Sequence, residues 1–396
     1  MLLSTEDPIV IVSHARTPMG GLQGELSSLP AAKLGAVAIK GAVQRAGLAP
    51  EDIDEVLMGC VLPAGQGQAP ARQAAIHGGL PNTVPCTTVN KMCGSGMKTV
   101  MMMAQALSAG SLSVGIAGGM ESMSNAPYLL PKARAGYRMG HGQVIDHMFL
   151  DGLEDAYEGG LMGTFAELCA DKYSFTREQQ DEYALASLDR ALAASEEAFT
   201  DEIVPVAVES RAGTAVYEKD EQPFKARRDK IPQLKPAFRR DGGTVTAANA
   251  SSISDGASAL LLMRKSEADK RGLAPLAKIT AMTSHAQEPA WFTTAPVGAL
   301  QKLFDAEGSK QSDYDLFEVN EAFAVVPLAA MEELGIEHDR MNVHGGACAL
   351  GHPIGASGAR IVAGLVNALK FRGLKRGAAG ICIGGGEATA ISVEMI

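Results

Sequence analysis

Three short glycine-rich motifs each contain a side chain that can act as a nucleophile or carry a proton. They are Asn-Lys-Met-Cys-Gly-Ser-Gly (90–96), Gly-His-Pro-Ile-Gly (351–355) and Cys-Ile-Gly-Gly-Gly (382–386). A thiol that forms and releases a thioester needs a depressed pKa, a proton partner and backbone amides directed at the developing oxyanion. Glycine lets the backbone approach the reacting atoms closely. Together the motifs favour cysteine-based acyl transfer.

The first motif places Cys93 directly before Gly-Ser-Gly and an expected helix over 94–109. The amino terminus of that helix is expected to stabilise a Cys93 thiolate. An isolated cysteine is more often a buried structural residue. We favour a nucleophile because the flanking glycines free backbone amides and because the other two motifs supply partners.

The second motif places His352 next to Pro353, which fits the first position of an expected helix over 355–369. A lone histidine is usually a capping or packing residue. In this glycine-rich setting, His352 is better explained as the base that takes the proton of Cys93.

The third motif places Cys382 at the end of an apolar run, where a cysteine can simply fill the core. The glycines that follow favour a second thiol that serves as acid or base at a substrate carbon, which ester hydrolysis does not require. Asn320, in Phe-Glu-Val-Asn-Glu-Ala-Phe, is interpreted equally well as a helix cap or as a site residue.

Composition and charge restrict the class of protein and its partners. The chain has 396 residues, 46% hydrophobic and 20% charged, and is long enough for two or more domains. Its net charge of -10 argues against nucleic acid and acidic membranes as partners. Six cysteines without a Cys-x-x-Cys pair, and an amino terminus without a basic or long apolar segment, favour a cytoplasmic protein without disulfide bonds.

Two kinds of binding site are disfavoured by the motifs that the sequence lacks. No spacing typical of metal ligands occurs. No Gly-x-Gly-x-x-Gly opens a helix after the first expected strand, which excludes a dehydrogenase of the usual dinucleotide-binding type.

The order of expected strands and helices is repeated in the first and last thirds of the chain. In each third, β-branched runs alternate with alanine-rich helical stretches, among them a helix expected over 31–46 and a strand expected over 316–319. The last strand but one of the last third is expected over 342–343. Ala117–Glu121 is expected to correspond to Ile383–Glu387. Residues 122–246 break the rhythm and indicate an inserted domain. Since ligands bind beyond the carboxyl ends of strands in such sheets, two half-sites are expected to share one cleft.

Further motifs follow one another along the whole chain. They are Ala-Arg-Thr-Pro (15–18), Gly-Gly-Met-Glu-Ser-Met (118–123), Val-Thr-Ala-Ala-Asn-Ala-Ser (245–251) and Asn-Glu-Ala-Phe (320–323). With the Gly-His-Pro and Cys-x-Gly motifs, this order resembles the thiolase family, and within it the short-chain acetyl-CoA acetyltransferases. The resemblance implies an α/β fold with a duplicated five-layered αβαβα core and an inserted loop domain.

The resemblance also implies domain limits and residue roles. The first core half is expected over 1–122 together with 248–274, and the second core half over 275–396. The loop domain is expected over 123–247, where it would cover coenzyme A and mediate oligomerisation. The acylated nucleophile would be Cys93, its activating base His352, and the acid or base at the substrate α-carbon Cys382. One oxyanion hole would be formed by His352 and by Asn320 through a bound water, and the other by the amides of Cys93 and Gly384.

The implied reaction is the reversible Claisen condensation of two acetyl-CoA to acetoacetyl-CoA and coenzyme A, without an obligatory cofactor or metal. Ser251 and Met162 are expected to contact coenzyme A. Arg227 and Arg228 are expected at its phosphates by charge and bidentate hydrogen bonding, although a solvated charge run explains them equally well. Relatives often have His-Met-Gly where this chain has Leu161-Met162-Gly163, so one pantetheine hydrogen bond is expected to be missing.

Assembly and competing functions complete the expectations. Residues 124–148 resemble the loop through which tetrameric members associate, which predicts a homotetramer built from dimers. The nearest alternative is a degradative 3-ketoacyl-CoA thiolase of broader chain length. A ketoacyl synthase is disfavoured by Cys382, and a non-catalytic acyl-CoA or lipid carrier is disfavoured by the complete set of reactive residues.

Overall fold

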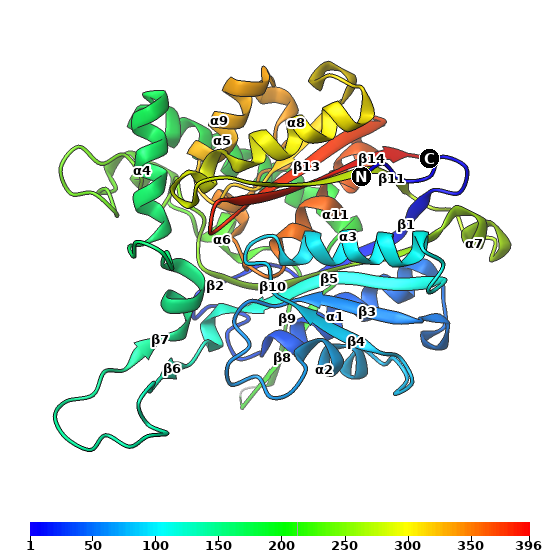
Figure 1. Ribbon diagram of the computed structural model, residues 1–396, viewed down its shortest axis with the longest axis horizontal. Coiled ribbons are helices and arrows are strands. Elements are labelled where there is room, and N and C mark those ends of the chain that lie inside the picture. Colours follow the sequence, from blue (N-terminus) through cyan, green and yellow to red (C-terminus); the bar gives the residue numbers. More distant parts are fainter. Residues whose placement is uncertain (212) are drawn as a thin grey trace.

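Two sheets, one from each end of the chain, form the body of the protein (Figure 1). The computed structural model describes residues 1–211 and 213–396. The first sheet contains β1 (Ile9–Arg16), β2 (Gly20–Gly21), β3 (Glu55–Gly59), β4 (Cys86–Val89), β5 (Val114–Ser122) and β10 (Ser254–Arg264). The second contains β11 (Ala277–Ala286), β12 (Leu316–Val319), β13 (Arg376–Ile383) and β14 (Glu387–Met395).

The two sheets have the same strand order. It is β4-β3-β5-β10-β1 in the first sheet and β12-β13-β14-β11 in the second. The second sheet has no full strand at the position of β4, where a single bridge joins Phe317 to Met341. A short antiparallel pairing of β1 with β11 joins them into one ten-stranded ladder. The predicted internal duplication is visible in this matching order.

Helices form three layers, one between the sheets and one on each outer face (Figure 1). The first sheet is covered by α1 (Ala31–Ala46) and α2 (Pro70–His77), and the second by α8 (Ala295–Glu307) and α9 (Val325–Leu334). The middle layer contains α3 (Ser95–Ser108) and α11 (Ser357–Arg372). This αβαβα arrangement confirms the predicted fold class.

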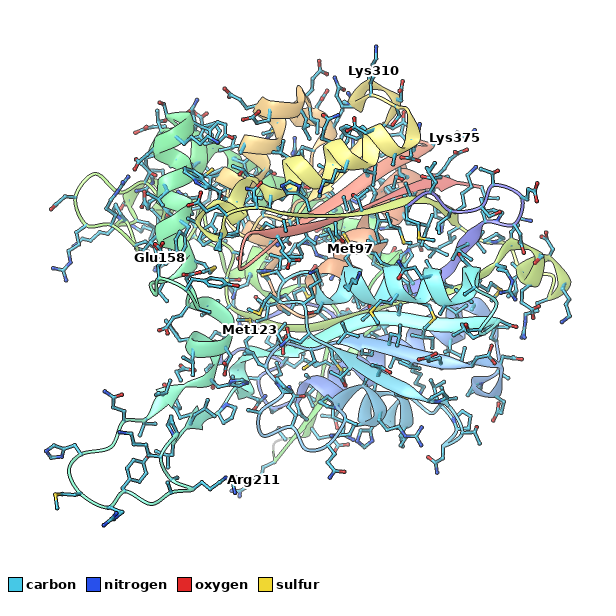
Figure 2. All side chains as sticks on the ribbon, in the orientation of Figure 1. Met97, Met123, Glu158, Arg211, Lys310 and Lys375 are labelled. Carbon is cyan, nitrogen blue, oxygen red and sulfur yellow. The ribbon has the colours of Figure 1, made fainter. Side chains whose placement is uncertain are left out.

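The two middle helices are apolar on most of their surface because a sheet lies on each side of them. On α11, nearly every residue from Ser357 to Leu369 is buried, and on α3, Met97 and Val100 are fully buried. Figure 2 shows Met97 between the two sheets, whereas Lys310 and Lys375 extend from the edge of the molecule. The central layer therefore fixes the two sheets relative to each other.

The segment between β5 and β10 adds helices and hairpins to one end of the sheets. Its longest helix, α5, begins at a capping box in which Thr176 and Gln179 exchange hydrogen bonds. The predicted limits of an inserted domain stay a prediction. Its elements are β6 (Tyr128–Leu129), β7 (Ile145–Asp146), α4 (Met162–Tyr173), α5 (Arg177–Glu196), β8 (Val206–Ser210), β9 (Gly213–Tyr217) and α6 (Glu221–Lys225).

Shorter elements connect the parts already described. They are the helices α7 (Lys265–Lys270) and α10 (Ala347–Leu350), the π-helical turn Phe149–Leu153, and the 3-10 turns Pro50–Asp52, Met123–Asn125, Ala198–Asp201, Arg228–Gln233, Pro289–Thr294, Gln311–Asp313 and His338–Arg340.

Equivalent aspartates set the register between the halves. Asp54 accepts hydrogen bonds from the amides of Ser113 and Val114, and Asp315 accepts them from Lys375 and Arg376, at the starts of β5 and β13. Counting from these starts, Glu121 corresponds to Ile383. The expected match of Ala117–Glu121 with Ile383–Glu387 is therefore wrong, because β13 reaches its glycine turn sooner than the sequence similarity suggests.

Two local expectations are also wrong. The strand expected over 342–343 is one bridge between Phe317 and Met341, because Asn342 turns the chain at a φ of 47° and its side chain accepts the amide of Val319. Pro353 is not the first residue of a helix, since α11 begins at Ser357.

Candidate active site

The reactive residues meet at the ends of the strands, in a cavity of about 370 Å³. Cys93 lies on the turn after β4, His352 on the loop before α11, and Gly384 on the turn between β13 and β14. All three line the cavity, together with Ser251 and Met162. Five of the nine predicted site residues thus share one space.

The turn that carries Cys93 is held rigidly by its own hydrogen bonds. Asn90 Oδ1 accepts the amide of Met92, which adopts a φ of 47°. The Ser95 hydroxyl accepts the amide of Lys91 and donates to the carbonyl of Met92. These bonds point the thiol away from the helix and into the cavity.

The Cys93 thiol is protonated near neutral pH in this structure. Burial raises its pKa to about 11, although hydrogen bonds from the amides of Gly384 and of Cys93 itself oppose the shift, and the charge of Glu121 adds to it. The expected stabilisation of a Cys93 thiolate by the helix terminus stays a prediction, because the pKa of the thiol is explained here by burial, the two amides and Glu121. Proton removal must then come from a neighbouring base.

His352 has the protonation state of such a base. Burial lowers its pKa to about 3, so the ring is neutral. The Ser357 hydroxyl donates to the carbonyl of Pro353 and therefore accepts from His352 Nδ1–H, at 2.6 Å. Nε2 is then the unprotonated nitrogen, and it is buried without a hydrogen-bond partner among residues 1–211 and 213–396. Sequence reasoning missed Ser357, whose place five residues after the histidine was the available signal.

Cys382 and Asn320 are buried and are not among the residues that line the cavity. Cys382 is fully buried in β13, and burial first and then the charge of Cys93 raise the pKa of its thiol. Asn320 directly follows β12, donates its amide to the carbonyl of Gly380, and accepts at Oδ1 from Arg360. Its Nδ2 is buried and has no hydrogen-bond partner in the part of the chain that the structure describes. Both side chains hold protons that are available for donation.

The Gly384 amide is the second donor to the Cys93 sulfur. It hydrogen-bonds the thiol together with the amide of Cys93, and both bonds favour negative charge at that point. A Cβ at Gly384 would meet only Met162 Sδ, at 3.6 Å. Two converging amides of this kind are the geometry that stabilises a tetrahedral oxyanion.

The cavity is lined mostly by apolar side chains, and a second hollow adjoins it. The second hollow shares Ala247 and Ser252 with the first and is lined by Arg227. Arg228 lines neither hollow, because it is exposed and pairs with Asp189 on α5. The structure thus disfavours the predicted role of Arg228 and leaves Arg227 in reach of a ligand that fills both hollows.

The aromatic walls of the cavity were not predicted. Phe238 and Phe323, and Phe292 and Phe323, meet edge to face around it. Leu161 also lines the cavity, at the position where relatives often have histidine and where one pantetheine hydrogen bond was expected to be missing. Aromatic residues scattered over distant segments give no local pattern by which sequence reasoning could find them.

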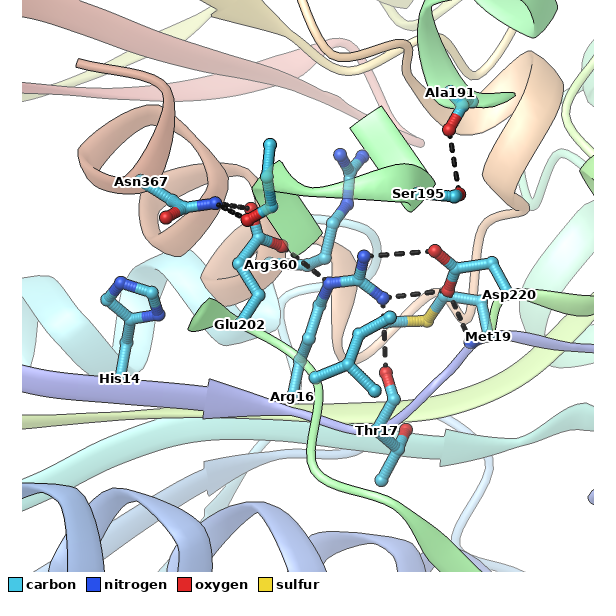
Figure 3. A network of polar contacts seen from close by, with 12 residues as sticks. His14, Arg16, Thr17, Met19, Ala191, Ser195, Glu202, Asp220, Arg360 and Asn367 are labelled. Carbon is cyan, nitrogen blue, oxygen red and sulfur yellow. Dashed lines mark hydrogen bonds and ion pairs between the residues drawn. The ribbon is translucent and has the colours of Figure 1, made fainter. Parts of the chain in front are cut away.

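A buried ion network fixes the segment that carries Arg227. The Arg16 guanidinium donates to Glu202 at 2.6 Å and to both carboxylate oxygens of Asp220 at 2.7 and 2.9 Å (Figure 3). Asp220 also accepts the amide of Met19 at 2.8 Å. The Ala-Arg-Thr-Pro motif therefore anchors the inserted segment to the end of β1, a role that the sequence analysis did not assign.

Comparison with known proteins agrees with this geometry. Residues 9–266 match the thiolase N-terminal domain, and residues 273–395 match the thiolase C-terminal domain. The chain belongs to the thiolase family. Acetyl-CoA acetyltransferase 2 of Arabidopsis thaliana is 52% identical over 391 residues, which cover 98% of this thiolase and 97% of that protein.

Solved thiolase structures superpose closely. The acetyl-CoA acetyltransferase of Bacillus anthracis has a TM-score of 0.95 at 39% identity, covering 98% of this chain and 99% of that one. The Acat5 thiolase of Ascaris suum, solved in complex with coenzyme A, has a TM-score of 0.92 at 43% identity, covering 98% and 100%. The family and the fold are thus established by sequence and by structure.

Two further features of this thiolase concern metals and membranes. Within residues 1–211 and 213–396, no group of three or more His, Cys, Asp or Glu side chains is arranged to hold a metal ion. No helix among the same residues combines the length and the apolar character needed to cross a membrane.

Proposed function

We propose that this thiolase is an acetyl-CoA C-acetyltransferase, which converts two acetyl-CoA to acetoacetyl-CoA and coenzyme A through an acyl-cysteine. The observation that carries the proposal is a half-buried Cys93 thiol, held by two amides, in one cavity with a neutral His352 whose Nε2 has no hydrogen-bond partner among the described residues. Full-length relatives that are named acetyl-CoA acetyltransferases support it.

In the first half-reaction, His352 Nε2 takes the proton of Cys93, and the thiolate attacks the thioester carbonyl of acetyl-CoA. The amides of Cys93 and Gly384 receive the developing oxyanion. Collapse of the tetrahedral intermediate breaks the carbon–sulfur bond, and Cys382 protonates the departing thiolate of coenzyme A. The products are acetyl-Cys93, protonated His352, the Cys382 thiolate and free coenzyme A.

In the second half-reaction, the Cys382 thiolate takes a methyl proton from a second acetyl-CoA. The enolate oxygen faces protonated His352 and Asn320 Nδ2, which acts through a bound water. The enolate carbon attacks acetyl-Cys93, which releases acetoacetyl-CoA and the Cys93 thiolate. His352 then returns its proton to Cys93, so that atoms and protons balance over the cycle. Thiolysis uses the same steps in reverse.

Ser251, Met162 and Arg227 are proposed contacts of coenzyme A. The mostly apolar cavity and the adjoining hollow support a ligand with an apolar pantetheine arm and a charged nucleotide end. The complex of the Ascaris suum relative with coenzyme A also supports it. No further cofactor or metal is included in the proposal.

Assembly and compartment remain proposals too. The segment from β6 to β7 extends from the body (Figure 1) and exposes Tyr128, Leu130, Met139 and Val144. Such an apolar surface supports a homotetramer that associates through residues 124–148, and light scattering that gives a monomer or simple dimer would refute it. Six free thiols support a reducing compartment such as the cytoplasm.

The test is the rate of thiolysis of 3-ketoacyl-CoAs of increasing chain length by the purified enzyme with coenzyme A. Activity confined to acetoacetyl-CoA is expected, because Phe149, Phe238, Phe292 and Phe323 narrow the cavity. Equal rates on longer chains would replace the proposal by a degradative 3-ketoacyl-CoA thiolase. Absence of thiolysis and of condensation would reject both.

A further inference from the structure

Glu121 is a buried carboxylate that the proposed reaction does not use. It lies at the end of β5, is fully inaccessible to solvent, and burial raises its pKa to about 7. It accepts the amides of Val61 at 2.9 Å and Leu62 at 3.1 Å, and the thiol of Cys60 at 3.5 Å. Its fourth donor comes from the other half of the molecule.

That donor is the amide of Gly355, at 2.9 Å from Glu121 Oε2. Gly355 ends the Gly-His-Pro-Ile-Gly loop, so one carboxylate ties the loop of the base to the first half. The carbonyl oxygen of Gly355 is held as tightly, because a Cβ added at Gly119, Gly59 or Gly96 would lie 2.0, 2.8 or 3.0 Å from it. The position of His352 is therefore set largely by residues of the nucleophile's half.

A second glutamate makes the reverse connection. Glu387 begins β14, directly after the glycine turn that carries Gly384, and it forms an ion pair with Lys91. Lys91 lies two residues before Cys93. The pair therefore joins the turn of the nucleophile to the turn that supplies the second oxyanion donor. It is partly exposed, at 25% for Lys91 and 38% for Glu387.

We propose that Glu121 and Glu387 are reciprocal positioning residues, each of which holds the catalytic turn of the opposite half at its working distance. Glu121 places the His352 loop against Cys93, and Glu387 keeps the Cys93 and Gly384 amides convergent. The inference rests on the proposed function. The two glutamates occupy different positions of the duplicated halves, so this exchange is not a product of the internal repeat.

The chemistry of Glu121 requires a carboxylate of this length. Oε2 accepts hydrogen bonds from the amides of Val61 and Gly355. Oε1 accepts hydrogen bonds from the amide of Leu62 and from the thiol of Cys60. A glutamine offers one oxygen and turns an NH₂ group toward backbone N–H donors. An aspartate keeps the charge but is one methylene too short. Either change leaves fewer well-placed acceptors for the four donors and is expected to loosen the hold on Gly355.

The first experiment compares Glu121→Gln, Glu121→Asp and the control Asp54→Asn in thiolysis of acetoacetyl-CoA. Asp54 also accepts two backbone amides, at the opposite end of β5. We expect kcat to fall by about tenfold to a hundredfold in both Glu121 variants, with KM within about threefold, as for a misplaced catalytic group. The control should lose thermal stability and keep its kcat. A kcat of either folded Glu121 variant within about twofold of wild type would overturn the proposal for Glu121.

The second experiment uses the accessible pair, in which folding is not at risk. Lys91→Glu and Glu387→Lys are each expected to lower kcat about fivefold, as like charges now face each other. The double variant, which restores the pair in reverse, should recover kcat to within about twofold of wild type. If the fall in kcat of the double variant equals the product of the two single falls, the proposal for Glu387 is overturned.

Wild-type enzyme is assayed beside every variant. If wild type fails to cleave acetoacetyl-CoA, the proposed function is wrong, whatever the variants do. If wild type is active and the variants match it, the proposed function stands and the positioning roles are wrong.

Discussion

The turn before α3 and the loop before α11 occupy equivalent places in the two halves, yet they carry different chemistry. Each helix begins with Ser-Gly, at Ser95 and Ser357. Ser95 closes the tight turn that presents Cys93, whereas Ser357 orients the ring of His352. Serines at equivalent positions thus support the nucleophile in one half and the base in the other.

Glycines let these two helix starts meet. A Cβ at Gly96 would lie 2.7 Å from the amide nitrogen of Ala359, and a Cβ at Gly358 would lie 2.4 Å from that of Met97. Duplication therefore supplied two matching turns that face each other across the middle layer. Side chains at the matching positions then divided the work between nucleophile and proton carriers.

The largest expected effect separates the two roles. We expect Cys93→Ala to lower thiolysis by at least about ten-thousandfold and to abolish acetylation by acetyl-CoA, because the nucleophile is gone. Cys382→Ala should lose condensation to a similar extent but still form acetyl-Cys93, since His352 still takes the proton of Cys93 and the coenzyme A thiolate can leave without a proton, although more slowly. Intact-mass spectrometry after mixing with acetyl-CoA, with Cys86→Ala as control, measures this. Acetylation of Cys93→Ala would assign the nucleophile elsewhere.

A matched pair of glycines tests the packing of the two halves. Gly118 in β5 corresponds to Gly380 in β13. A Cβ at Gly118 would lie 2.2 Å from the carbonyl oxygen of Ser258, whereas a Cβ at Gly380 would lie 3.5 Å from the Leu300 side chain. Gly118→Ala should destabilise by about 3 kcal/mol and Gly380→Ala by less than about 1 kcal/mol. Urea denaturation measures both, and equal losses would contradict the difference between the halves.

The stability of the protein in acid should depend on His14, a buried histidine of the first half. Burial lowers the pKa of His14 to about 4, whereas an unfolded histidine titrates near 6.5. The unfolded chain thus binds the proton first, and His14 costs stability as the pH falls below 6.5. The stability of His14→Gln relative to wild type should improve by about 2 kcal/mol between pH 7 and pH 5. Urea denaturation at both pH values measures it. The exposed His77→Gln is the control, and a constant difference for His14→Gln would contradict a neutral buried ring.

The smallest expected effect concerns Arg227 and Arg228, which lie outside both catalytic turns. Arg227→Ala should raise the KM for acetoacetyl-CoA about fivefold, because a charged contact to phosphate is lost. Arg228→Ala should change KM less than about twofold, since its exposed pair with Asp189 carries little energy. Steady-state kinetics at one ionic strength distinguishes them. A larger effect of Arg228→Ala would restore its predicted contact with coenzyme A.

Much of the fold followed from local pattern. α1 and β12 were expected with the bounds that the structure has, because alanine-rich periodicity and a short apolar run are unambiguous over those residues. The strand expected over 342–343 failed because one asparagine in a left-handed conformation ends it. The correspondence of the halves failed by four residues because Gly118 and Gly119 lie inside β5, whereas Gly384 to Gly386 lie on the turn after β13.

The site followed from motifs only in part. Cys93, His352 and Gly384 were placed together correctly, since motifs after equivalent strands must meet at one edge of the sheets. Ser357 was not assigned although its partner His352 is only five residues away, whereas Glu121 and the aromatic walls have partners far away in the sequence. The contact of Arg228 with coenzyme A stays a prediction that the structure disfavours, because a basic run does not reveal which arginine faces a cleft and which faces Asp189.

The sequence by itself determined which residue types carry the chemistry, where they stand relative to the strands, and that the architecture is duplicated. Local spacing and backbone preference suffice for these. Only the tertiary structure decided the protonation of Cys93 and His352, the freedom of His352 Nε2, and the exchange of glutamate contacts between the halves. These depend on desolvation and on hydrogen bonds between segments that only folding brings together.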